Sequence, residues 1–77
     1  MIQGRKEVDA LEEAQRYTLK ELRARKNETQ EQTARALGIS VQTYNAWEKD
    51  ISNVAISKVA AVAEHFGVAL KDIFFAL

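Results

Sequence analysis

The sequence predicts a compact all-α domain, and three observations indicate this fold class. Proline is absent and glycine occupies only 3 of the 77 positions, a scarcity typical of helices joined by very short turns. Apolar residues recur at the three- and four-residue spacing of a helix face. Ser, Thr, Asn or Gly stands at most places where such a stretch begins or ends. We therefore expect five helices around one core, preceded by an N-terminal extension.

The five helices are expected in residues 18–77. Residues 1–17 form the N-terminal extension, which is charged and rich in helix formers, and we expect it to be helical or fraying. The first two helices of the domain span Leu19–Lys26 and Gln30–Leu37. The third spans Val41–Lys49. The fourth stops at Gly67, and its apolar face is formed by Ile56, Val59, Val62, Ala63 and Phe66. The fifth runs from about Leu70 to Phe75, with Leu70, Ile73 and Phe74 as its apolar residues.

Short polar residues and glycines mark the ends of these helices. Asn27 tolerates the left-handed conformation and is expected to end the first helix. Thr29 and Gln32 have the spacing of a capping box at the start of the second helix. Gly38 is expected to end that helix, and Ser40 to cap the third one two residues later. These signals predict very short linkers between the first three helices.

Composition excludes several classes of protein. The absence of cysteine excludes a disulfide framework and a thiolate metal site. No apolar run is long enough to span a membrane, residues 1–16 are too charged for a signal peptide, and we expect a cytoplasmic protein. His65 is the only histidine, expected on the surface near a helix C-terminus, and no glycine-rich phosphate loop is present. We expect neither an enzyme nor a cofactor or metal. Eleven basic residues balance eleven acidic ones, so net charge does not indicate a nucleic-acid partner.

Residues 29–48 carry the functional signal. The turn Gly38–Ile39–Ser40 is so short that the helices on either side of it must cross steeply. Ala34 is small enough to allow close approach, and the angle between the helices is filled by Leu37, Ile39, Tyr44 and Trp47. The spacing of the two aromatic residues, Tyr44 and Trp47, indicates core positions rather than a base-stacking surface. A rigid pair of this kind has a protruding second helix, and such a helix fits the major groove of DNA.

This stretch resembles the helix-turn-helix of the lambda-type repressor and Cro family, also called the xenobiotic-response-element family. The match consists of Gln30, Ala34, Gly38, Ile39, Ser40 and the pair Trp47–Glu48. The flanking segments 19–23, 56–66 and 67–73 resemble the first, fourth and fifth helices of the family, so the resemblance covers about Leu19 to Phe74. It implies a transcriptional regulator of the repressor or Cro type, from a phage or prophage, that binds double-stranded operator DNA.

The resemblance also implies roles for individual residues. The helix that starts at Val41 is expected to contact bases, through Val41, Gln42, Thr43, Asn45 and Ala46. Thr43 can reach either a base edge or a phosphate, and Asn45 points toward either the DNA backbone or an adjacent base. Phosphate contacts fall to Lys20, Gln30, Ser40 and Lys49. Arg23 and Glu48 correspond to a structural ion pair between the first and third helices. The other interpretation of Gln42, Thr43 and Asn45 is the solvated face of a surface helix.

Several residues depart from the family pattern. Asp50 stands where glycine usually makes a left-handed turn, Ile51 and Ser52 replace cations, and Ala46 replaces a long polar side chain. Fewer phosphate contacts predict modest affinity per subunit. We therefore expect a homodimer on two half-sites, formed through Phe74, Phe75 and Leu77, unless Phe74 closes the core and the other two fray. Thr33 and Glu28 replace apolar residues, which concerns packing more than recognition.

One alternative function belongs to a different class. On the same scaffold the chain could be a protein-binding module, an antitoxin or a regulator-interacting subunit, with weak or no DNA binding. That interpretation needs an apolar patch near the third helix, made by Val41, Ala46, Ile51 and Val54. A strong loss of binding with added salt would favour DNA, whereas association insensitive to salt would favour a protein partner.

Overall fold

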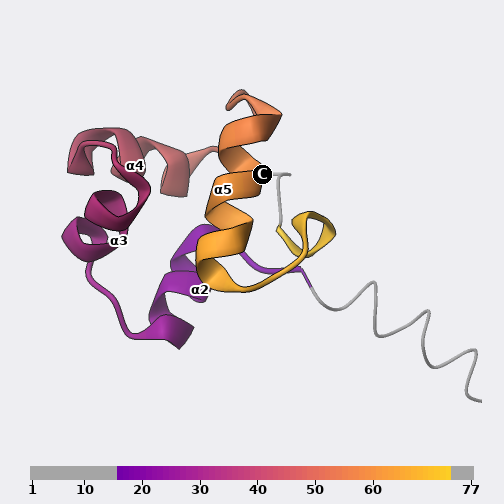
Figure 1. Cartoon of the computed structure of the whole chain (residues 1–77), viewed down its shortest axis with the longest axis horizontal. Coiled ribbons are helices and arrows are strands. Elements are labelled where there is room, and N and C mark those ends of the chain that lie inside the picture. The colour runs from indigo at the N-terminus through magenta and orange to yellow at the C-terminus, as the bar shows by residue number, and fades with distance from the viewer. Residues whose placement is uncertain (1–15, 74–77) are drawn as a thin grey trace, which may run out of the picture.

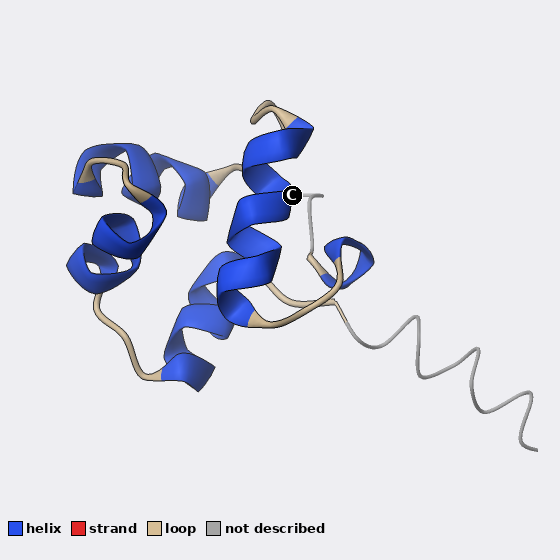
Figure 2. Ribbon diagram, viewed as in Figure 1, coloured by secondary structure: helices blue, strands red, loops and turns tan. Residues whose placement is uncertain are grey.

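The computed structural model describes residues 16–73, which fold into four α-helices and one 3-10 turn (Figure 1). The elements are α2 (Leu19–Lys26), α3 (Gln30–Leu37), α4 (Val41–Lys49), α5 (Ile56–Phe66) and η1 (Leu70–Asp72). Short loops join them, and the described part of the chain contains no strand (Figure 2). The all-α prediction is therefore confirmed for these residues. Residues 1–15 and 74–77, which include most of the expected extension and Phe74, Phe75 and Leu77, lie outside them.

The predicted fifth helix is wrong in type and length. Only the three residues of η1 are helical, and they form a 3-10 turn. Ile73 leaves this turn in extended backbone, with φ −92° and ψ 129°, because it forms an isolated parallel bridge with Tyr17. The Tyr17 N–H donates to the Asp72 carbonyl over 2.8 Å, and its ring packs on the core beneath the Arg25 guanidinium, 4.6 Å from the ring centre. The chain preceding α2 is thus paired with the end of the domain.

Side-chain caps begin α2, α3 and α4. The Thr29 hydroxyl accepts from the Gln32 N–H over 3.0 Å, and the Gln32 side chain accepts from the Thr29 N–H over 2.8 Å, which confirms the predicted capping box. The Ser40 hydroxyl accepts from the Thr43 N–H over 3.1 Å, as predicted. Thr18 and Glu21 form a further capping box at α2, which was not predicted although their spacing carries the same signal.

Left-handed residues end α2, α3 and α5. Asn27 has φ 60°, Gly38 has φ 74° and Gly67 has φ 71°, so all three predicted stops are confirmed. The left-handed turn at Gly38 matters most for the site, since it redirects the chain between α3 and α4 within three residues. A Cβ at Gly38 would meet no atom within 4 Å, so glycine is favoured there by its backbone conformation and not by lack of space.

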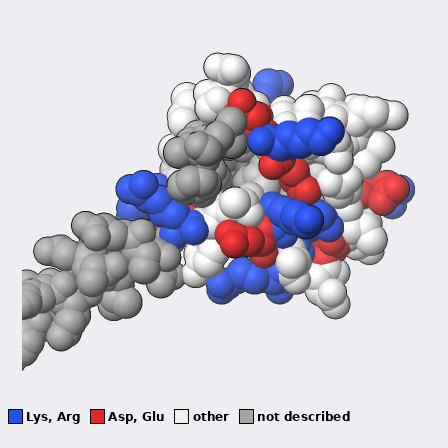
Figure 3. All heavy atoms as spheres, turned by 180° about the vertical axis from the view of Figure 1, so that it is seen from behind, with Lys and Arg blue, Asp and Glu red and all other residues white. Residues whose placement is uncertain are grey.

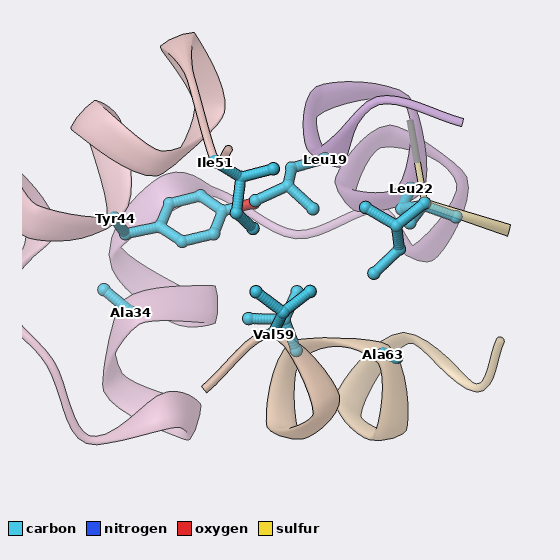
Figure 4. Packing of buried hydrophobic residues seen from close by; sticks show 9 residues of the cluster. Leu19, Leu22, Ala34, Tyr44, Ile51, Val59 and Ala63 are labelled. Carbon is cyan, nitrogen blue, oxygen red and sulfur yellow. The ribbon is translucent and has the colours of Figure 1, made fainter. Parts of the chain in front are cut away.

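The core lies where the four helices meet (Figure 4). Tyr44 of α4 is fully buried and points between α2 and α5, against Leu19, Ile51 and Val59. In Figure 1, α3 and α4 lie together on one side of the molecule, while α5 stands between them and η1. The other buried apolar side chains come from α2, α3, α5 and the bridge to the N-terminus: Leu22, Ala34, Val62, Ala63 and Ile73.

Two isoleucines are placed differently from the prediction. Ile56, expected on the apolar face of its helix, is 61% exposed, because it occupies the first position of α5 while the inward face of that helix begins at Val59. Ile51 of the preceding loop is buried instead, at 4% exposure. It therefore cannot belong to the exposed apolar patch that the protein-binding alternative requires. Val41 and Val54 also pack partly against the core, so Ala46 is the one member of that patch that is exposed.

Candidate nucleic-acid interface

One face of α4 is open to solvent. Gln42, Thr43, Ala46 and Lys49 are all exposed, and their spacing of one, three and four residues places them side by side along the helix. Val41 and Asn45 are half-buried, Val41 against the core and Asn45 toward α3. The opposite side of α4 is anchored by the buried Tyr44 and the half-buried Trp47, as expected for core positions. The structure thus exposes four of the residues assigned to DNA contact on one helix face.

The turn before α4 fixes the direction of its first residues. Gly38 and Ile39 return the chain through hydrogen bonds to the carbonyls of Arg35 and Ala34, over 3.1 and 3.0 Å. The Ser40 hydroxyl then accepts from the Thr43 N–H and donates to the Thr43 hydroxyl, over 3.1 and 2.9 Å. Ser40 is exposed, so its hydroxyl lies at the surface beside Gln42 and Thr43.

An ion pair ties α4 to α2, between the two residues for which the resemblance implied it. The Arg23 Nε donates to Glu48 Oε2 over 2.5 Å, and Nη2 donates to Oε1 over 3.3 Å. The side chains are only 17% and 6% exposed, so the pair is largely withdrawn from water. Arg23 Nη1 also donates to the Glu28 carbonyl over 3.0 Å, which joins the α2–α3 linker to the same cation. The exposed face of α4 is therefore held by a contact on the opposite side of the helix.

Comparison with known proteins agrees with this geometry. The model of the family described as helix-turn-helix matches residues 19–73, which are most of the chain. The chain belongs to the helix-turn-helix family. One relative in this family is a protein of Methanocaldococcus jannaschii named as an uncharacterized HTH-type transcriptional regulator, 43% identical over 56 residues, which are 73% of this chain and 85% of that protein. No solved structure gives a significant match.

A short hydrogen-bonded series of side chains crosses the helix-turn-helix from α4 to α2. The Asn45 Nδ2 donates to Gln30 Oε1 over 3.2 Å, and the Gln30 Nε2 donates to Glu48 Oε1 over 2.9 Å. Glu48 in turn accepts from Arg23. Gln30 is the first residue of α3, so this series connects the start of one helix of the motif with the middle and end of the other.

The ionisable groups of this series are held in their charged forms. Burial alone would raise the pKa of the Glu48 carboxyl, but hydrogen bonds from Arg23 and Gln30 outweigh it and keep that pKa below its ordinary value of 4.5. The same hydrogen bond with Glu48 raises the pKa of Arg23. Burial, with the nearby Glu48 carboxylate, raises the pKa of the Tyr44 phenol, whose hydroxyl makes no hydrogen bond of ordinary geometry within residues 16–73.

A second polar cluster, which was not predicted, joins Glu28, Thr33 and His65. The Thr33 hydroxyl donates to Glu28 Oε1 over 2.6 Å, and His65 Nε2 lies 2.8 Å from the same oxygen. Thr33 is fully buried and the His65 side chain is only 16% exposed, so the expected surface position of His65 is wrong. Burial alone would raise the pKa of the Glu28 carboxyl, but the hydrogen bonds with Thr33 and His65 have the larger combined effect and hold that pKa below its ordinary value. The sequence offered one signal for this cluster: Glu28 and Thr33 are polar residues at positions where apolar ones are usual, and polar residues inside a fold need polar partners such as His65.

The loop after α4 is built without a left-handed residue. Asp50 has φ −163° and ψ 110°, an extended conformation that any residue adopts, so no glycine is needed at this position. Its carboxylate Oδ1 accepts from the Ser52 N–H and hydroxyl over 2.9 and 2.6 Å, and these hydrogen bonds lower its pKa. Asp50 thus organises the loop that brings Ile51 into the core.

Charge on the molecule is mixed. On the face opposite to that of Figure 1, Lys and Arg side chains are interspersed with Asp and Glu (Figure 3). Lys20 and Lys49, the two cations assigned to phosphate contact, are both exposed. No group of three or more His, Asp and Glu side chains within residues 16–73 has the arrangement of a metal site. None of the helices between these residues combines the length and apolar character that a membrane crossing requires.

Proposed function

We propose that this protein is a transcriptional regulator that binds double-stranded DNA and recognises an operator half-site with α4. The observation that carries the proposal is the exposed polar face of α4, held by the buried Tyr44 and the Arg23–Glu48 pair on its other side. A protruding, rigidly held helix is the element that enters a major groove. Membership of the helix-turn-helix family and the name of the Methanocaldococcus jannaschii relative support the same function.

Base recognition falls to the first turns of α4. Gln42 has the amide donor and acceptor that pair with the N6 and N7 of adenine, and Thr43 reaches either a base edge or a phosphate. Val41 and Ala46 offer apolar contact to a thymine methyl group. The phosphate contacts proposed for Lys20, Gln30, Ser40 and Lys49 orient the domain on the duplex without carrying sequence information.

We propose that the protein is a homodimeric repressor or Cro-like protein, because few phosphate contacts per subunit make binding by a single subunit weak. A repressor or Cro-like protein of phage type would bind as a homodimer to two half-sites about one helical turn, ~34 Å, apart. We propose dimerisation through the C-terminal residues Phe74, Phe75 and Leu77. A sedimentation-equilibrium mass equal to one chain at high micromolar concentration would contradict a dimer in solution.

Selection from a pool of random duplexes, followed by anisotropy titration of the selected DNA at two salt concentrations, tests the function. Gln42→Ala should relax the preference at one base pair by about 1–3 kcal/mol, whereas Lys49→Gln should weaken binding to all sequences and reduce the salt slope by about 1. Glu64→Ala, on the exposed side of α5, is the control and should leave both unchanged. Absence of saturable binding at micromolar protein and low salt would refute the proposal.

A further inference from the structure

Asn45 stands apart from the other polar residues of α4. Gln42 and Thr43 are exposed, but Asn45 is half-buried, and its side-chain N–H is directed to α3, where it donates to Gln30 Oε1 over 3.2 Å. This contact is one of two between α4 and Gln30, the first residue of α3; the other is the hydrogen bond from Gln30 to Glu48. Asn45 therefore has a hydrogen-bond partner within the motif, whereas a side chain that contacts a base is expected to be exposed, as Gln42 is.

The neighbouring Glu48 decides how the Gln30 amide is oriented. A carboxylate only accepts hydrogen bonds, so the group of Gln30 that faces Glu48 at 2.9 Å must be its NH2. The carbonyl oxygen of Gln30 consequently faces the other way and needs a donor, which the Asn45 NH2 supplies. Arg23 completes the arrangement, since its two hydrogen bonds keep Glu48 ionised and in place. Both ends of the Gln30 amide are thus fixed by acceptor and donor chemistry.

This orientation leaves one N–H of Gln30. An amide NH2 has two hydrogens, one of which is used by Glu48, and no side chain or backbone group within residues 16–73 accepts the other. A phosphate oxygen is an acceptor, and the start of a helix is where a phosphate is favoured by free backbone amides. If the amide were reversed, its carbonyl would face the phosphate and repel it.

We propose that Asn45 is a positioning residue for Gln30: it fixes the side-chain amide so that an N–H, and not the carbonyl, is available to the DNA backbone. This inference rests on the proposed DNA-binding function and changes the role expected of Asn45, from contacting a base or the DNA backbone itself to orienting the phosphate contact of Gln30. Recognition of sequence then falls to Gln42 and Thr43, with Val41 and Ala46 for apolar contact.

A double-mutant cycle between Asn45→Ala and Gln30→Ala separates the two roles. A positioning residue predicts that Asn45→Ala weakens binding roughly three- to tenfold, the loss of about one ordinary hydrogen bond, equally on the selected and on unrelated DNA. It also predicts no further loss when Gln30 is already Ala. Gln42→Ala is the matched control on the same helix. It should change the base preference, and its loss of DNA affinity should add to that of Gln30→Ala. Additive losses for Asn45→Ala, or a changed preference at one base pair, would overturn the inference while leaving the proposed function intact.

A measurement without DNA tests the positioning itself. In the free protein the side-chain amide protons of Gln30 should exchange faster with solvent in Asn45→Ala than in the wild type or in Gln42→Ala, as followed by NMR. Equal exchange rates in all three proteins would overturn the inference even where DNA binding is established. Failure of the wild-type protein to bind any duplex refutes the proposed function instead, and with it the phosphate contact of Gln30. Thermal melting of each variant verifies that α4 remains folded.

Discussion

Replacing Arg23 by Met removes the cation from the carboxylate that anchors α4. The methionine fills much of the space of the arginine stem, but Glu48 loses its cation and keeps the hydrogen bond from Gln30, with 6% of its side chain exposed. Breaking a buried pair by removing one partner costs 3–5 kcal/mol, because the remaining charge stays buried and unpaired. Arg23 retains 17% exposure, which places the loss near the lower end, at about 3 kcal/mol.

A loss of this size is a large part of the stability of so small a protein. For 77 residues the free energy of unfolding is roughly 4–12 kcal/mol, and each kcal/mol lost lowers the melting temperature by about 4–8 °C in this size range. Arg23→Met should therefore melt about 12–24 °C below the wild type. Arg35→Met, an exposed arginine of α3, is the control and should change the free energy of unfolding by about 0.5 kcal/mol or less.

The pH dependence of this loss identifies its cause. In the wild type the pKa of Glu48 is lowered, so the stability from the pair is fully present above the ordinary value of 4.5 and is lost as pH falls through the lower native pKa. In Arg23→Met the burial is no longer compensated, and protonation of Glu48 relieves the penalty. The gap between the two proteins should be largest near pH 7 and should close toward pH 3. Glu28, whose pKa is also lowered, acts equally in both proteins.

Urea unfolding of the two proteins between pH 3 and pH 7, with Glu48→Leu and the double variant, is the assay. The double variant should lose less than the two single variants together, because it leaves no unpaired charge. A loss below about 1 kcal/mol at pH 7, a gap that does not change with pH, or additive losses would each refute the reasoning from the buried pair.

Two further variants test other parts of the fold by urea unfolding. Thr33→Val keeps the shape of a fully buried side chain but removes the hydrogen bond to Glu28, so we expect a loss of about 1–2 kcal/mol; an unchanged midpoint would mean that this cluster does not stabilise the domain. Asn27→Ala should lose about 1 kcal/mol, because the residue has φ 60°, whereas Asn27→Gly should be at least as stable as the wild type; equal stability of the two variants would contradict a left-handed requirement at this position.

The sequence alone determined the local structure of this protein. Capping residues and left-handed stops depend on the chemistry of one to four neighbouring residues, which explains why the end of α2, both ends of α3 and the start of α4 were predicted and agree with the structure. The short turn at Gly38 fixed the crossing of α3 and α4 for the same reason. The exposed face of α4 followed from helical spacing, since the burial of Tyr44 determines which side faces outward.

Only the tertiary structure decided contacts between residues that are distant in sequence. The bridge from Tyr17 to Ile73 ends η1 after one turn. No residue near Leu70 indicates this contact, because Tyr17 lies more than fifty residues earlier in the sequence. The burial of His65 against Glu28 and the pairing of Asn45 with Gln30 depend on helix packing, which sets distances of a few ångströms between side chains on different elements. Periodicity shows which side of a helix is apolar, but the groups opposite each side chain are fixed only when the helices meet.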